Sequence, residues 1–131
     1  MKRNWILITT ALGVLAASLA GTGCQKLKAR DQLNKGVQAF RSANYTAAVE
    51  HFKQALEADP TFHNARLYLA TAYMNQWIPG ADSPENQQMA QGARENFEQV
   101  LAEDPNNTVA LSSLASMAFH EAGGIQDTDA K

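Results

Sequence analysis

The sequence predicts an all-α fold built from helices that recur along the chain. The segment from Ala48 to Pro60 recurs from Ala93 to Pro105, with seven of the thirteen aligned residues identical. Each copy ends in Asp-Pro, and the residue before a proline avoids the helical region, so each copy is a helix with a defined end. The composition, 45% hydrophobic and 18% charged, is typical of a folded rather than a disordered chain.

The spacing of apolar residues predicts five helices. We expect them at residues 26–42, 46–58, 63–77, 84–103 and 108–121. The fourth has a clear start, because Ser83 can cap it and Pro84 suits its first turn. Its apolar face repeats that of the second helix at the same spacing, with Ala93, Phe97, Val100 and Leu101 in place of Ala48, Phe52, Ala55 and Leu56.

Small and large residues in register along the chain resemble the tetratricopeptide repeat. The first unit matches with Gly36, Tyr45, Ala48, Phe52, Ala55 and Pro60, and the second with Leu69, Ala70, Tyr73, Ala93, Phe97 and Pro105. A third first helix matches with Ala110, Leu114, Ala115 and Phe119. The first helix departs from the usual apolar choices at Gln32, Lys35 and Ala39. The resemblance implies a solenoid of helix-turn-helix pairs, about two and a half repeats, over residues 27–122.

The second unit is longer than a regular repeat of that family. Pro60 and Pro105 are 45 residues apart, against about 34 in the family, which leaves about 11 extra residues. Residues 77–84 form a loop by composition and separate the two helices of the unit. We expect most of this loop to be a surface insertion. Two roles stay open for Trp77: it plugs the helix ends, or it faces a partner.

By the same resemblance, the first helix of each unit lines the concave side of the array. The residues expected to face this groove are Leu33, Val37, Phe40 and Arg41 in the first unit, Leu67, Tyr68, Thr71 and Met74 in the second, and Ser112, Ser116 and Phe119 in the third. Some family members clamp a carboxylate here with basic and amide side chains, but those positions hold Leu33, Val37, Tyr68, Val109 and Ser113. An apolar, aromatic groove predicts a protein or peptide partner. The alternative is that the chain's own termini cover part of this face.

The first 24 residues have the layout of a bacterial lipoprotein signal. Lys2 and Arg3 precede an uncharged, mostly apolar run, and small residues then lead to the single cysteine, Cys24. The stretch from Leu19 to Cys24 resembles a lipobox, although Gly21 stands where a leucine is usual. The resemblance implies that Cys24 is acylated and that the signal is cut before it.

This interpretation predicts a signal peptide at residues 1–23 and a lipidated linker at 24–26. The protein would be exported to the bacterial cell envelope and lipid-anchored to a membrane, facing the periplasm or the cell exterior. The apolar run covers residues 5–20, which is shorter than the roughly 20 residues that a membrane-spanning helix needs. The alternative is an ordinary signal peptide with an unmodified cysteine nearby.

The sequence holds no pattern typical of an enzyme, a cofactor site or a metal site. His51, His63 and His120 are far apart and do not have the spacing of metal ligands. The formal net charge is -2 and the basic residues are scattered, which argues against a nucleic-acid partner. We therefore expect a non-catalytic protein without cofactor or metal.

The third unit has its first helix but no second helix. Residues 123–131 are polar, and we expect a tail or the start of a truncated segment there. The edge from Leu111 to Phe119 is too apolar for a fully exposed cap. The leading prediction is a scaffold or adaptor that holds protein partners of the envelope. One alternative is the N-terminal repeat region of a longer envelope protein or enzyme, truncated at Lys131; another is self-association through the Leu111–Phe119 edge.

Overall fold

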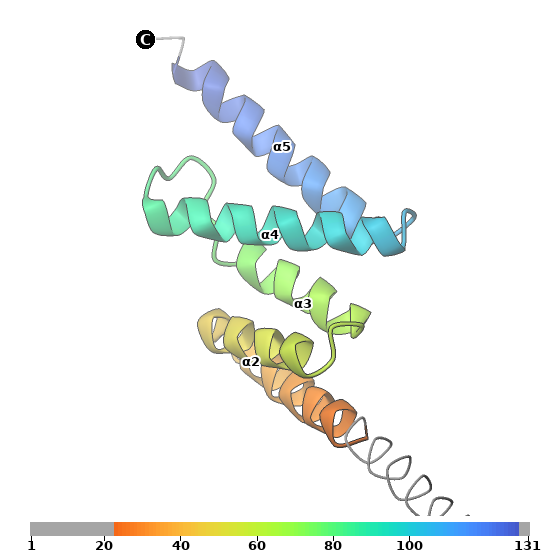
Figure 1. The fold of residues 1–131 in the computed structure, drawn as a ribbon. Coiled ribbons are helices and arrows are strands. Elements are labelled where there is room, and N and C mark those ends of the chain that lie inside the picture. The colour runs from red at the N-terminus through yellow and green to blue at the C-terminus, as the bar shows by residue number, and fades with distance from the viewer. Residues whose placement is uncertain (1–22, 129–131) are drawn as a thin grey trace, which may run out of the picture.

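A computed structural model describes residues 23–128, with side chains described as far as residue 123, and this region is a stack of helices without strands. A first helix at 23–41 is followed by α2 (Tyr45–Ala58), α3 (His63–Met74), α4 (Pro84–Glu103) and α5 (Thr108–Thr128). The helices lie one upon the next in chain order (Figure 1). The all-α prediction is confirmed over this range. Residues 1–22, which hold nearly all of the predicted signal peptide, lie outside it.

Two helix ends and one start differ from the prediction by three residues or more. The first helix already includes residues 24–26, so this segment is helical rather than a linker. α3 ends at Met74 instead of residue 77. α5 continues beyond residue 121 to Thr128, through the glycine at 123 where we expected a tail. A glycine inside a helix costs only about 1 kcal/mol relative to alanine, so it need not end one.

Short polar side chains cap three of the helices. The Asn44 side chain accepts a hydrogen bond from the backbone N–H of Ala47 at the start of α2. Ser83 does the same for Asn86 at the start of α4. Asn107 accepts from Ala110 at the start of α5, at 3.1 Å. Each cap satisfies one of the N–H groups that a helix start leaves without a partner, and this fixes where the helices begin.

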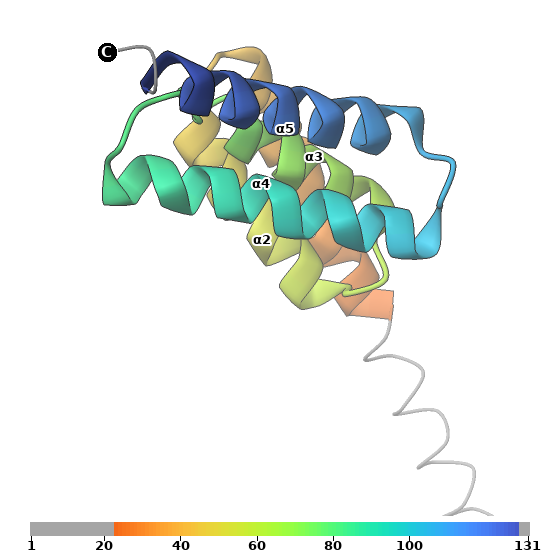
Figure 2. The ribbon, with the colours of Figure 1, turned by 90° about the horizontal axis from the view of Figure 1, so that it is seen from above.

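Two fully buried phenylalanines organise the core, and they are the pair that the internal repeat aligns. Phe52 packs with Ala48, Val49, Leu69 and Ala72 between the first helix, α2 and α3. Phe97 belongs to the second cluster, which joins α3, α4 and α5 and also contains Ala70, Ala93, Val100, Ala110 and Met117. Tyr73 packs against both clusters and links them. Viewed from above, the helices overlie one another (Figure 2). The two clusters are made by side chains from neighbouring helices of this stack.

The loop between α3 and α4 is held by Asn86, which is 8% exposed. Its side-chain oxygen accepts from the N–H of Ile78 at 2.7 Å, and its amide nitrogen donates to the carbonyls of Ile78 and Ala81 at 2.9 and 2.8 Å. Gly80 supplies the left-handed turn, with φ 80°. One side chain thus satisfies three backbone groups and ties the inserted residues to the first turn of α4.

Changing Asn86 to alanine should loosen this loop and lower the free energy of unfolding by about 1–2 kcal/mol. Each lost hydrogen bond is worth about 1 kcal/mol, and the loss is reduced because the loop backbone can bond water instead. Urea denaturation gives the stability change, and amide hydrogen exchange at Ile78 gives the local one. Glu98→Ala on the exposed side of α4 serves as the control and should change neither.

Trp77 packs inward rather than projecting from the loop. It is half-buried against the Phe97 cluster, and its ring meets that of His120 edge-on, with centroids 6.2 Å apart. This packing against the array agrees with the first of the two roles left open for this residue. Ile78, the next residue, is 63% exposed.

Candidate protein-binding groove

Of the groove residues predicted on the first helix, some are half-buried in the structure and one is exposed. Leu33, Val37 and Phe40 are half-buried and pack against the Phe52 cluster. Phe40 also meets the ring of Tyr45 edge-on, with centroids 5.2 Å apart. Arg41 is exposed at the end of the helix. The three apolar residues therefore stabilise the array, and only part of each remains open to a ligand.

The residues predicted on α3 are also shared between core and surface. Leu67 and Met74 are half-buried against the Phe97 cluster. Tyr68 is 41% exposed, and its ring stacks on Phe52 with centroids 5.5 Å apart. The Thr71 hydroxyl donates to the carbonyl of Leu67 in its own helix, at 2.8 Å. Tyr68 is therefore the α3 residue of this set that offers a large, supported ring to a partner.

On α5, the predicted residues lie on the side away from α4. Ser112 is exposed, and its hydroxyl donates to the carbonyl of Val109 at 3.2 Å. Ser116 is half-buried. Phe119 is 75% exposed, which is the largest exposed fraction among the large apolar residues of the described region. The structure does not draw these three residues into a site with those of the first helix.

A pocket of about 320 Å³ opens where α3 begins and α4 ends. Its floor is apolar and its rim polar, the arrangement usual for binding one side chain of a ligand. The lining comes from three segments of the chain: His63, Asn64 and Leu67 on α3, Val100 and Glu103 on α4, and Asp104 and Asn107 in the turn that follows. Of the predicted groove residues, Leu67 alone lines it.

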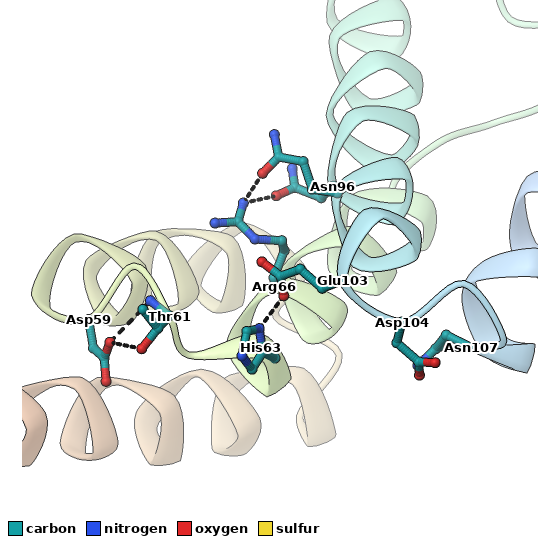
Figure 3. Close-up of polar contacts among 9 residues, drawn as sticks. Asp59, Thr61, His63, Arg66, Asn96, Glu103, Asp104 and Asn107 are labelled. Carbon is teal, nitrogen blue, oxygen red and sulfur yellow. Dashed lines mark hydrogen bonds and ion pairs between the residues drawn. The ribbon is translucent and has the colours of Figure 1, made fainter.

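Polar contacts bridge α3 and α4 beside this pocket. His63 pairs with the carboxylate of Glu103 across its mouth (Figure 3). One turn further along, Arg66 donates to the side chains of Gln99 and Asn96, the latter at 3.4 Å. All of these groups are at least partly exposed, so their contribution to stability is small. They bridge the two helices beside the pocket, while the buried Phe97 cluster holds the helices together.

The two Asp-Pro turns are built alike and frame the starts of α3 and α5. Asp59 accepts from the hydroxyl and the N–H of Thr61 at 2.7 and 3.1 Å, and the hydroxyl bond holds the pKa of Asp59 below its usual value (Figure 3). Asp104 accepts from the N–H of Asn106 at 3.3 Å and from the side chain of Asn107 at 3.2 Å. Both carboxylates are thus engaged within their own turns.

Sequence reasoning missed the pocket because its residues are far apart along the chain. His63 and Glu103, for example, are 40 residues apart. The repeated Asp-Pro turn was the one signal in the sequence that could have indicated the pocket, because the pocket lies beside the second of these turns. Over the described residues, no three His, Cys, Asp or Glu side chains come together as metal ligands.

Cys24 lies in the first helical turn of the described region, and its thiol is free and exposed. No helix within residues 23–128 has both the length and the apolar character needed to cross a membrane.

Comparison with known proteins identifies one repeat. A tetratricopeptide repeat family model matches residues 39–76, which include α2, the first Asp-Pro turn and α3. No curated protein and no solved structure matches the chain. The family match, together with the stacked helices on either side of it, supports a tetratricopeptide repeat protein, and such repeats generally mediate protein–protein interactions.

Proposed function

We propose that this protein is a non-catalytic scaffold, held at the bacterial cell envelope by acylated Cys24, that binds a segment of a partner protein between its helix pairs. The observation that carries the binding role is the pocket between α3, α4 and the turn before α5, next to the matched repeat. The anchoring role rests on the basic, apolar and small-residue order of the sequence before Cys24.

The pocket's chemistry suggests what the partner presents. Leu67 and Val100 form an apolar floor suited to one aliphatic or aromatic side chain. Glu103 and Asp104 place carboxylates at the rim. Glu103 also pairs with His63, and Asp104 accepts hydrogen bonds within its own turn, so a hydrogen-bond donor or a basic group of the partner would share these oxygens. A short peptide segment with an apolar residue next to a lysine or arginine fits both features. Tyr68, with its ring supported by Phe52, adds an aromatic surface on the same helix.

Site-directed photo-crosslinking tests the binding role. A crosslinking amino acid at Asn64, an exposed residue of the pocket lining, should capture a partner from membranes of the source organism. The same amino acid at Gln54, exposed on α2, is the matched control and should not. Filling the pocket with Asn64→Trp should remove binding of that partner, while Gln54→Trp should keep it. The same crosslinked proteins from both positions would contradict a role for the pocket.

Mass spectrometry of the mature N-terminus tests the anchor. We expect a chain that begins at Cys24 and carries the mass of a diacylglycerol, as the resemblance to a lipobox implies. Its two acyl chains would anchor the protein, whereas one acyl chain alone gives only marginal membrane binding. Cys24→Ser should leave the protein uncleaved or release it from the membrane. An unmodified Cys24 in the mature protein would refute the anchor without touching the binding role.

A further inference from the structure

The first helix and α3 each have one face covered by the helix that follows. In the first unit, Gln32 contacts His51 on α2 at 2.8 Å, and Gly36 lies directly against the ring of Phe52. In the second unit, 34 residues on, Arg66 contacts Asn96 on α4, and Ala70 is fully buried in the Phe97 cluster. In both units, therefore, the helix that follows packs against the same two positions of the helix before it.

On α5 the same face has no helix over it within the described residues. A shift of 45 residues, the one that relates Phe52 to Phe97, takes Arg66 to Leu111 and Ala70 to Ala115. Leu111 is 47% exposed and Ala115 is exposed, as is Ala118 one turn on. α4 covers the other side of α5, where Ala110 and Met117 are fully buried.

The open face also carries the pattern of the helices that cover the other two units. α2 presents Ala48, Phe52 and Ala55 at spacings of four and three. α5 presents Ala115, Phe119 and Ala122 at the same spacings, and all three are exposed. α5 is therefore both a surface that accepts such a helix and a helix of that kind.

We propose that this face, defined by Leu111, Ala115, Ala118, Phe119 and Ala122, binds the same face of a second copy of the chain. An antiparallel pairing about residue 117 sets Phe119 of each copy over Ala115 of the other, because the two positions lie two residues to either side of 117. This sets a phenylalanine against a small residue, as Ala70 and Phe97 are set within one cluster in the second unit, and it makes the interface self-complementary, as two-fold symmetry requires.

The first two units each have a polar contact beside the covering phenylalanine, and its counterpart on α5 agrees with a second copy as the partner of this face. Gln32 and Arg66 face His51 and Asn96, each of which directly precedes the covering phenylalanine. At the equivalent position α5 has Leu111, and the residue preceding Phe119 is Ala118. An apolar pair thus replaces the polar pair on both sides. Residues 108–119 contain no charged side chain, and Glu121, which follows, pairs with Arg94 on α4, so pairing of these residues brings no like charges together.

This surface is separate from the pocket, so its test is independent of the proposed partner binding. Sedimentation of the full chain in mild detergent should give a dimer. Ala115→Arg, at an exposed position where folding is unaffected, should raise the dimer dissociation constant at least tenfold. Ala102→Arg, at another exposed alanine, on α4, should leave it unchanged. In a Cys24→Ser background, Ala118→Cys should form a disulfide-linked dimer on oxidation and Ala102→Cys should not.

Three results would overturn the proposal. These are a strict monomer at all concentrations, a dimer that Ala115→Arg leaves intact, or a crosslink that forms as readily at 102 as at 118. A monomer that instead binds a synthetic α2 peptide through Ala115 would show that the face takes a helix of another protein. Circular dichroism of each variant confirms that the helices are retained.

Discussion

Replacing Phe97 by alanine should lower the free energy of unfolding by about 3–5 kcal/mol, the range for removing a fully buried phenylalanine from a packed core. The ring packs with Ala70, Val100 and Met117, so its loss leaves a cavity that touches α3, α4 and α5 at once. A domain of this size has only about 5–15 kcal/mol of stability in total. We therefore expect a large fall in melting temperature, measured by circular dichroism at 222 nm.

Ile78→Ala is the matched control for that experiment. This residue is also large and apolar, but 63% of it is exposed on the loop, so its truncation should change the stability by no more than about 0.5 kcal/mol. Equal melting temperatures for the Phe97 variant and the native protein would contradict the described core.

Gly36→Ala should destabilise the protein by about 1–3 kcal/mol, although alanine is the better helix former. A methyl group at this position would lie 2.5 Å from the nearest carbon of the Phe52 ring. That ring is fully buried and cannot move without disturbing Ala48 and Leu69 around it. The overpacking therefore outweighs the gain in helix propensity, which is about 1 kcal/mol. Urea denaturation measures the net effect.

Gly123→Ala provides the opposite case. No atom lies within 4 Å of a methyl group at that position in α5, so only the helix propensity changes. We expect this variant to be at least as stable as the native protein. If both glycine variants proved stabilising, the first helix and α2 would not be as close as described.

Much of the fold could be predicted from the sequence because its signals are local. The spacing around Phe52 and Phe97 defines helix faces, and the Asp-Pro turns define where two helices end. The end of α3 could not be predicted, since the sequence alone does not show that Trp77 leaves the helix to pack against the Phe97 cluster. The role of Asn86 was also hidden, because its partners lie in a loop with no regular pattern.

The binding surfaces were predicted less well, for a related reason. Helical spacing gives the face on which Leu33 and Val37 lie, but it does not tell how far a neighbouring helix covers that face. The pocket depends on side chains from α3, α4 and a turn, and nothing in their spacing brings His63 and Glu103 together. The exposed edge around Leu111 was predictable. The repeat pattern places a first helix there, its residues are apolar, and no second helix was predicted to cover them.

The one-sided burial of α5 sets the order in which the array opens. α3 lies between helices on both sides, whereas α5 is held by α4 through Ala110 and Met117 and by the Arg94–Glu121 ion pair at 2.6 Å. In such arrays each layer is stabilised mainly by its neighbours, so a layer with one neighbour opens at lower free energy. In the monomer, the amide protons of α5 should therefore exchange with solvent before those of α3.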